Sequence, residues 1–334
     1  MSNFPENTAE ILNDARWLPH GFDAAQNAVS FIRIERSRLA ETAFLADAEP
    51  TAGIQPVSVP MAEIAHAANI PSAPMHFIFH TAFCRSTLLA RALEQPGVSA
   101  GLCEPGILAR IGGAGPDVLP AVSRLLARPW GAGETNFVKP SNHTNALIPA
   151  LMEANPASRA VMMTNPLPSF LAAVVRKGMM GRRWARQLYL EVMAYAGMDL
   201  GMDAREQFAM TDLQAAGLAW FLNQRFFDAL ARKYPGRMRV LDGDHFGREP
   251  AAVLAAVGGF TGAAIDTERA AAIASGPVFT ADAKTGEDYA AKSARDTAAT
   301  QSAVVEDEIA KVGEWVGMIA AQAGVEVPVR GTLV

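Results

Sequence analysis

Residues 76–91 constrain the fold more than any other part of this 334-residue chain. An apolar run is followed by a short turn that carries Arg85, Ser86 and Thr87, and then by the leucine-rich pattern of a helix. A buried strand that leads through a tight turn into a helix is the building unit of parallel α/β sheets. Because the helix is predicted to begin at Ser86, its free backbone N–H groups and positive dipole end would face the turn, which favours binding of a phosphate or sulfate group.

The same alternation of strand and helix continues along the chain. Further apolar strands are predicted at residues 98–103, 136–139, 159–163 and 237–241. Helical patterns follow at residues 86–94, 118–127, 145–154, 169–177, 183–198, 213–233, 250–257 and 303–321. Apolar strands between amphipathic helices indicate a parallel sheet with helices on both faces. The predicted fold class is therefore α/β, with a three-layer α/β/α core and a mainly parallel central sheet.

The first part of the chain differs from this pattern. Residues 29–34 alternate as a strand, residues 61–68 have a helical pattern, and prolines interrupt the sequence around them. We therefore divide the chain into a small α+β extension, residues 1–72, and a core domain, residues 73–334, that ends in a helical C-terminus. Residues 280–300 are polar and poor in large apolar side chains, which predicts a mobile loop.

The composition disfavours several function classes. The net charge is −5 and the sequence pI is near 5.7, so we expect no nucleic-acid partner. No run of about eighteen apolar residues is present, and the polar first residues lack the pattern of a signal peptide, so we expect no membrane partner. The two cysteines cannot form a disulfide framework, and no spacing is typical of a metal site. These features favour a cytoplasmic protein without a bound metal.

Polar side chains follow each predicted strand of the core. In parallel sheets the carboxyl ends of the strands meet at one edge, where ligands bind, so we expect these side chains to lie together. They are Thr81 to Thr87 after the first strand, Glu104 after the second, Lys139 after the third, Thr164 and Asn165 after the fourth, and residues 242–245 after the fifth.

The turn after the first strand is not the usual loop of ATP- and GTP-binding enzymes. That loop needs G-x-x-x-x-G-K-[ST], whose lysine reaches the β- and γ-phosphates. Residues 81–87 contain no glycine, and Arg85 stands directly before Ser86 and Thr87. A P-loop phosphotransferase that uses ATP is therefore disfavoured, although it remains an alternative.

The turn instead resembles the 5′-phosphosulfate loop of the sulfotransferases. These enzymes share the P-loop nucleotide-binding fold and use 3′-phosphoadenosine 5′-phosphosulfate (PAPS). Residues 83–89, F-C-R-S-T-L-L, are similar to a loop of a basic residue, a small residue, Ser/Thr-Thr and two leucines. Arg85 departs from the usual glycine, and Phe83 from the usual basic residue. The resemblance implies that the donor is bound by Thr81, Phe83, Cys84, Arg85, Ser86 and Thr87.

Three further stretches resemble the same family in the same order. Residues 102–105, L-C-E-P, are similar to its [RS]-E-P segment. Residues 137–161 resemble its K-x-P…L…P-x-A-[KR]-[FV] run, and residues 240–260 resemble its closing Y-E-D-L…P…L…F-L-G segment. Together the four stretches cover roughly residues 75–262.

The resemblance implies transfer of a sulfuryl group from PAPS to a hydroxyl or amine of a small-molecule or peptide acceptor. Glu104 is the expected general base, by analogy with the glutamate of the family. His80 is the alternative base, because imidazole titrates near neutrality. Arg85 or Lys139 would stabilise the charge that develops on the bridging oxygen.

The expected site for the nucleotide 3′-phosphate departs from the family pattern. The family places an arginine after the fourth strand, where this chain has Thr164, and a serine further on, where it has alanine. Asn165 and Ser169 are the nearby substitutes, although a phosphate prefers a guanidinium group. A non-catalytic relative, or one with an altered donor, therefore remains a second interpretation.

Each candidate residue also has a structural interpretation. Ser86 and Thr87 are typical helix caps. A thiol at a helix N-terminus, such as Cys84, can have a lowered pKa and form a redox pair with a neighbour such as Cys103. Two small buried thiols are the simpler interpretation of these cysteines.

Overall fold

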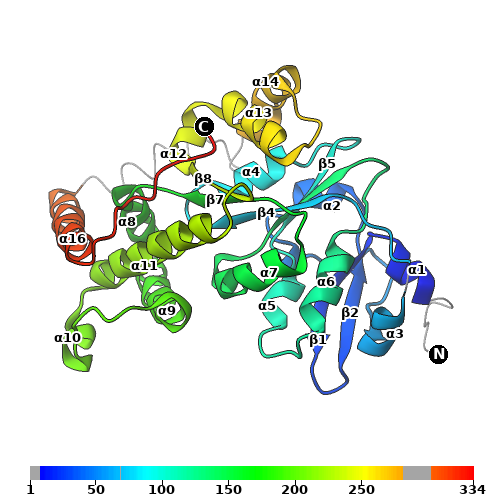
Figure 1. Cartoon of the computed structure of the whole chain (residues 1–334), viewed down its shortest axis with the longest axis horizontal. Helices are drawn as coiled ribbons and strands as arrows, with labels where there is room; N and C mark the ends of the chain where they lie inside the picture. The colour runs from blue at the N-terminus through cyan, green and yellow to red at the C-terminus, as the bar shows by residue number, and fades with distance from the viewer. Residues whose placement is uncertain (1–7, 68, 281–301) are drawn as a thin grey trace.

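A computed structural model of the chain describes residues 8–67, 69–280 and 302–334 (Figure 1). At its centre lies a five-stranded sheet with the strand order β5-β6-β4-β7-β8. Its strands are β4 (Met75–His80), β5 (Ser99–Cys103), β6 (Thr135–Lys139), β7 (Ala160–Thr164) and β8 (Met238–Asp242). All neighbouring strands in this sheet run parallel. The predicted α/β class with a mainly parallel sheet is therefore confirmed, and the predicted strands agree with the observed ones within one residue at each end.

The central strand, β4, lies where the connections between strands diverge. After β4 the chain crosses to β5 on one side, whereas after β7, the other neighbour of β4, it continues to β8 on the opposite side. In open α/β sheets, ligands bind outside the carboxyl ends of the strands at such a switch point. The residues that follow His80 and Thr164 therefore lie at the edge where a ligand is expected.

Helices lie on both faces of the sheet (Figure 1). Ile78 and Val161 join a cluster with the helices of one face, whereas their chain neighbours Phe77 and Met162 join a cluster with those of the other. Because alternate side chains enter two cores, the strands have continuous apolar sequences. The helices of the first face are α4 (Ser86–Ala92), α12 (Gly243–Arg248), α13 (Pro250–Thr261) and α14 (Thr267–Ala274). Those of the second include α5 (Gly106–Arg110), α6 (Val118–Leu126), α7 (Ile148–Ala154) and the end of α11 (Asp212–Lys233).

The amino-terminal segment forms a small antiparallel sheet with short helices. Its strands are β1 (Trp17–Asp23), β2 (Ala28–Arg33) and β3 (Val57–Pro60), and its helices are α1 (Thr8–Asn13), α2 (Ser37–Glu41), η1 (Leu45–Asp47) and α3 (Met61–His66). Phe31 of β2 belongs to the same hydrophobic cluster as Phe77 of β4, so the two sheets share one core. The fully buried Arg128 joins them further, because its guanidinium donates to the backbone carbonyls of Ile11, Asp14 and Trp17.

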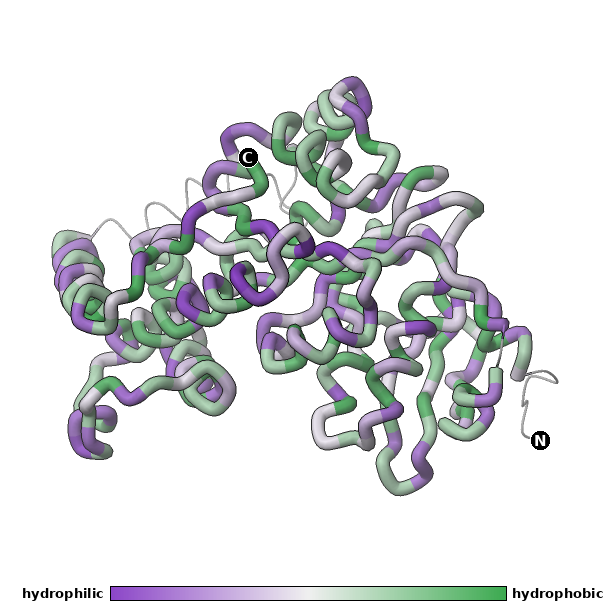
Figure 2. Tube along the Cα trace, viewed as in Figure 1, coloured by the Kyte–Doolittle hydropathy of each residue, from purple (hydrophilic) through white to green (hydrophobic). Residues whose placement is uncertain are grey.

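A group of helices extends beyond one end of the central sheet (Figure 1). α8 (Leu167–Arg176), α9 (Gly178–Ala196), α11 and α16 (Ala303–Gln322) pack around a separate hydrophobic cluster. The prediction placed the start of α9 too late, at residue 183. The helix begins at Gly178, and the tight turn from α8 brings Gly181 against the Val174 carbonyl, where a Cβ would lie only 2.3 Å from its oxygen. α10 (Ala204–Ala209) has no buried residue, and its middle residues, 205–207, are hydrophilic (Figure 2).

Two shorter elements complete the described chain. The predicted helix at residues 145–154 begins instead as the 3-10 turn η2 (Asn142–Leu147), and α7 starts at Ile148 with a proline in its first turn, a position that proline favours. η3 (Pro277–Phe279) follows α14. The mobile loop predicted at residues 280–300 lies, apart from its first residue, outside the described residues. Within the described ranges, none of the helices has the length and apolarity needed to cross a bilayer.

Candidate active site

The loop between β4 and α4 has an unusual backbone. Ala82, Phe83 and Arg85 have φ angles of 75°, 54° and 60°, in the left-handed region that non-glycine residues rarely adopt. Glu104, after the neighbouring end of β5, has a φ angle of 51°. Asn27 is the one other described non-glycine residue with a positive φ angle. Each such residue costs of order 1–3 kcal/mol, and such strain is typical of functional sites. The strain of the described chain is therefore concentrated at the carboxyl edge of the sheet.

The loop offers several hydrogen-bond donors to a ligand. The backbone N–H groups of Phe83, Cys84 and Thr87 donate to no acceptor within the described part of the chain. A left-handed residue, Arg85, followed by the first helical residue, Ser86, produces the kind of concave backbone that binds anions. The Thr81 hydroxyl is buried, with the residue 1% exposed, and has no partner among the described residues. These donors suit an oxyanion.

Ser86 and Thr87 are not the cap of α4. The N-cap position belongs to Arg85, whose side chain makes no capping hydrogen bond. The Cys84 sulfur instead lies close to the Ser86 side chain and to the backbone of Thr81 and Ser86. Part of the loop interior is therefore taken by this thiol, while the amides of Phe83, Cys84 and Thr87 are left for a ligand.

Both cysteines are buried, as the simpler interpretation predicts. Burial raises the pKa of the Cys84 thiol above its ordinary value, although Lys139 and the hydrogen bonds from Ser86 and Thr81 oppose part of this shift. The Cys84 thiol also donates to the Met163 carbonyl at 3.5 Å. A raised pKa keeps the sulfur protonated, which argues against the reactive thiolate that a redox pair needs.

An ion pair joins the predicted residues Lys139 and Glu104 beside the loop. Lys139 Nζ lies 2.5 Å from Glu104 Oε1, and the side chains are 0% and 19% exposed. The Glu104 backbone N–H also donates to the Lys139 carbonyl at 2.6 Å, which fixes the end of β5 to the end of β6. A group that can accept a proton and a cation that can stabilise an oxyanion therefore lie within one hydrogen bond of each other.

His80 is buried at the end of β4 and holds the loop with both ring nitrogens. Its Nδ1 accepts the backbone N–H of Ala82 at 3.2 Å, so the proton of the neutral ring is assigned to Nε2. Nε2 donates to the Pro140 carbonyl at 3.2 Å and lies 3.9 Å from Glu104 Oε1. These contacts suit a residue that positions the loop more than one that takes a proton from an acceptor.

Arg85 extends to the opposite side of the loop from Lys139, towards α12. Its Nη1 lies 2.6 Å from Asp244 Oδ1, and the predicted residue Ser169, from α8, donates to Asp244 Oδ2 at 2.8 Å. Arg85 and Asp244 are 32% and 24% exposed. The structure thus brings Arg85 and Ser169 together, but around a carboxylate of the chain itself.

Thr164 is the last residue of β7, and Asn165 follows it on the same side. Thr164 is buried, and its hydroxyl accepts a hydrogen bond from the Gln224 side chain of α11. Asn165 lies against the loop, where its Nδ2 donates to the Phe83 carbonyl at 3.4 Å and its buried Oδ1 has no partner within the described ranges. Asn165 is therefore placed at the loop as predicted, whereas an uncharged pair occupies the place of the missing arginine.

A histidine–carboxylate pair that the sequence did not indicate lies close to the loop. His143 Nδ1 lies 2.5 Å from Glu191 Oε2, and the Trp184 indole donates to His143 Nε2 at 3.1 Å. Trp184 meets Phe83 of the loop edge-on, with ring centroids 5.0 Å apart. The only sequence signal is the position of His143 shortly after a strand end, because Glu191 and Trp184 come from a helix with no motif.

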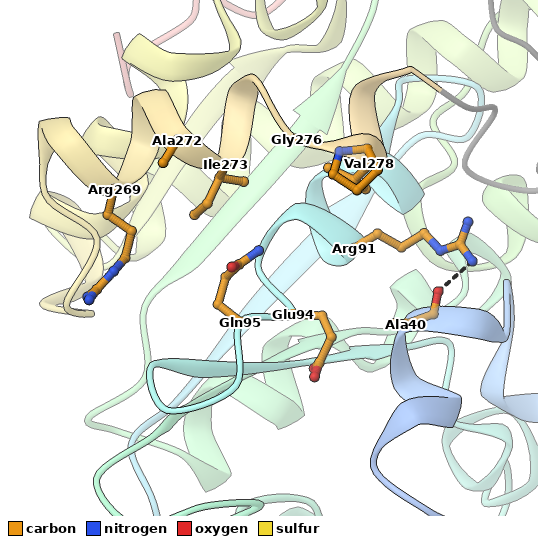
Figure 3. A pocket seen from close by; sticks show the side chains of 10 residues that line it. Ala40, Arg91, Glu94, Gln95, Arg269, Ala272, Ile273, Gly276 and Val278 are labelled. Atoms are coloured by element: carbon orange, nitrogen blue, oxygen red, sulfur yellow. Dashed lines mark hydrogen bonds between the residues drawn. The ribbon is translucent and has the colours of Figure 1, made fainter.

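A pocket of about 770 Å³ opens at the other end of α4 (Figure 3). Its polar side chains are already engaged: Arg91 donates to the Ala40 carbonyl, and Glu94 accepts from Arg36. None of the residues predicted to bind a donor or catalyse a reaction lines this pocket. The strained backbone and the unpaired donors lie at the loop instead, so we place the candidate site there.

Comparisons with known proteins give one similar structure. No family model matches the chain, and no curated protein matches it. A solved structure, the sulfotransferase domain from the curacin biosynthetic pathway, is similar over 78% of this chain and 100% of that domain, with 14% identity and a TM-score of 0.43. At so low a TM-score we base the function on the geometry of this chain.

Proposed function

We propose that this protein is a sulfotransferase that moves a sulfuryl group from PAPS to a hydroxyl or amine of a small molecule or peptide. One observation carries the proposal: the strained loop after β4 leaves three backbone amides and the Thr81 hydroxyl without partners among the described residues, next to the ion pair of the buried Lys139 with Glu104. A strained backbone with unpaired donors favours an oxyanion ligand.

The residues present fit the phosphosulfate end of PAPS. The orphaned Thr81 hydroxyl, the amides of Phe83, Cys84 and Thr87, and the ammonium of Lys139 would hold its oxygens. The 3′-phosphate end fits less well, because Thr164 is buried against Gln224 and offers no charge. Arg85 and Ser169 would hold that phosphate in place of the arginine that the family uses.

The side chains around the loop can perform the chemistry that sulfuryl transfer requires. Bound PAPS would supply the sulfuryl group. Glu104 would accept the proton of the acceptor hydroxyl or amine, which typically contributes about 10²–10⁴-fold in rate. Lys139 would stabilise the negative charge that develops on the leaving oxygen. His80 would hold the loop and the end of β6 in register through its two ring nitrogens.

The His143–Glu191 pair is an alternative proton acceptor. A carboxylate on Nδ1 orients an imidazole and fixes its tautomer. In this chain Nε2 accepts the Trp184 N–H, so the ring would have to exchange that bond for the acceptor. Glu104 needs no such exchange at its second oxygen and lies directly beside Lys139.

Two other functions compete with this proposal. An ATP-dependent phosphotransferase would need a lysine at the position of Arg85, and Arg85 here pairs with Asp244. A non-catalytic relative is favoured by the uncharged Thr164–Gln224 pair and by the neutralised Arg85. Such a protein would still bind an anion at the loop but would not catalyse sulfuryl transfer.

Isothermal titration with adenosine 3′,5′-bisphosphate, ATP with magnesium, and GTP tests the donor. We expect binding of the bisphosphate only, lost in the Lys139→Met variant and kept in the matched control Lys177→Met, which removes an exposed lysine from the α8–α9 turn. Transfer of labelled sulfate from PAPS to a panel of phenols, alcohols and amines then separates the enzyme from a non-catalytic relative. Binding of ATP in preference to the bisphosphate would refute the proposal.

A further inference from the structure

The Asp244 carboxylate occupies the position of a ligand. One of its oxygens accepts from Arg85 Nη1 at 2.6 Å, and the other accepts from Ser169 Oγ at 2.8 Å. A guanidinium and a hydroxyl that converge on two oxygens of one anion are the donors that also bind a phosphate or sulfate group. Asp244 therefore satisfies the donors that an incoming oxyanion would need.

Neighbouring glycines hold this carboxylate on Arg85. At Gly243 a Cβ would lie 2.2 Å from the Cys84 carbonyl oxygen, and at Gly247 a Cβ would lie 2.8 Å from Arg85 Nε. At Gly243, where the contact is with backbone, only glycine permits α12 to approach the loop this closely. Asp242 Oδ1 also accepts the Asp244 backbone N–H at 2.8 Å, which fixes the start of α12. The backbone of Asp244 is therefore fixed against the loop, while its side chain alone contacts Arg85 and Ser169.

The same ion pair is open to exchange. Arg85 and Asp244 both reach solvent, and ion pairs with such exposure are worth only about 0.2–1 kcal/mol. A ligand with two negative charges can compete for the Arg85 guanidinium if the Asp244 side chain rotates away, and no backbone movement is required for that rotation. The Lys139–Glu104 pair differs, because the Lys139 side chain is 0% exposed.

We propose that Asp244 is an internal competitor at an oxyanion site formed by Arg85 and Ser169, and that a phosphate or sulfate group binds there only by displacing it. The proposal deepens the proposed function and rests on it for the identity of the natural ligand, the nucleotide phosphate. The competitor keeps Arg85 neutralised in the free protein and lowers its affinity for any anion.

The variant Asp244→Asn tests this inference, because it removes the charge and keeps the size. Isothermal titration at constant ionic strength would compare it with the unaltered protein, using sodium sulfate and adenosine 3′,5′-bisphosphate as separate ligands. We expect roughly fivefold tighter binding of both ligands, the gain that corresponds to losing an exposed ion pair. Asp244→Glu, which retains the charge, keeps the weak binding, and Arg85→Gln weakens binding in either background. Glu249→Gln, an exposed carboxylate after α12, is the matched control and changes nothing.

The outcomes separate the two proposals. Tighter sulfate binding by Asp244→Asn without any nucleotide binding supports the competitor and refutes the PAPS donor. Nucleotide binding that is equal or weaker in Asp244→Asn, with an unchanged melting temperature, refutes the competitor and leaves the donor intact. If Asp244→Asn does not fold, Ser169→Ala replaces it. Removing the Ser169 hydroxyl takes a hydrogen bond from both Asp244 and the bound sulfate. The two losses offset each other under the proposal, so the sulfate affinity should fall less than twofold. A larger fall refutes the proposal.

Discussion

The two cations beside the loop are both paired with carboxylates, but in different surroundings. Lys139 is fully buried and its partner Glu104 is 19% exposed, whereas Arg85 and Asp244 are 32% and 24% exposed. Removing one partner of a buried pair typically costs about 3–5 kcal/mol, and removing one of an exposed pair costs less than about 1 kcal/mol. The comparison indicates that the Lys139 side is a fixed part of the site, and the Arg85 side is the part that a ligand can rearrange.

The largest effect is expected from Lys139→Met, which breaks the buried side. Glu104 would be left without its cation beside the cavity that the fully buried Lys139 side chain occupied, so we expect the free energy of unfolding to fall by about 3–5 kcal/mol. Urea denaturation followed by circular dichroism measures this change. The double variant Lys139→Met with Glu104→Gln should recover part of the loss, because no unpaired charge remains. A loss below about 1 kcal/mol would show that the Lys139–Glu104 ion pair contributes no more to stability than the exposed Arg85–Asp244 pair does.

Glu104→Gln separates the chemical role of the buried side from its structural role. The amide oxygen can still accept from Lys139 but cannot take a proton, so we expect turnover to fall by about 10²–10⁴-fold while the affinity for adenosine 3′,5′-bisphosphate stays within a few fold. Steady-state transfer of labelled sulfate measures turnover. His143→Gln, tested in parallel, should lower turnover less. The reverse order would assign the base to His143 and Glu191.

A smaller effect is expected on the exposed side, in Arg85→Gln. The ion pair with Asp244 contributes little to folding, so the free energy of unfolding should fall by less than about 1 kcal/mol. The melting temperature should therefore shift only slightly. Affinity for anions should nevertheless fall, because the guanidinium is lost. Arg248→Gln, at the exposed end of α12, is the control and should alter neither quantity. Strong destabilisation by Arg85→Gln would show that Arg85, like Lys139, is required for the stability of the fold.

The smallest effect concerns Cys84, which lies near the buried side. Burial raises the pKa of this thiol, so less thiolate is present at any pH than in an ordinary cysteine. We therefore expect almost no alkylation by iodoacetamide at pH 8 in the folded protein and complete alkylation in urea. Mass spectrometry of the labelled peptide gives the extent. Rapid labelling of the folded chain would revive the redox interpretation.

The central fold could be predicted from the sequence because its signals are local. Each core strand is an apolar run that ends at a polar or proline residue, and such runs locate strands well. β1 was missed because Pro19, His20 and Gly21 interrupt its alternation, and β3 because it spans only Val57–Pro60 among prolines. The strand order is a property of how the connections pack, so the sequence alone did not determine it.

The sequence predicted only those contacts of the candidate site that join residues at the ends of neighbouring strands. Glu104 and Lys139 end adjacent parallel strands, so the rule that carboxyl ends meet at one edge brings them together. The partners from helices were not predictable, because the Arg85–Asp244 and His143–Glu191 contacts depend on how α12 and α9 pack against the loop. No local pattern marks a residue as the neighbour of another that lies far away in the chain.

Arg128 has a consequence for how the amino-terminal segment can change. Its guanidinium lies over the Phe31 ring, 5.8 Å from the centroid, and its hydrogen bonds to that segment go to main-chain oxygens of Ile11, Asp14 and Trp17. Such an anchor is indifferent to which amino acids occupy those positions, but it is sensitive to the number of residues between them. Substitutions at the solvent-facing positions of this stretch should be tolerated, whereas adding or deleting a single residue would pull the carbonyls out of reach and release the segment from the core.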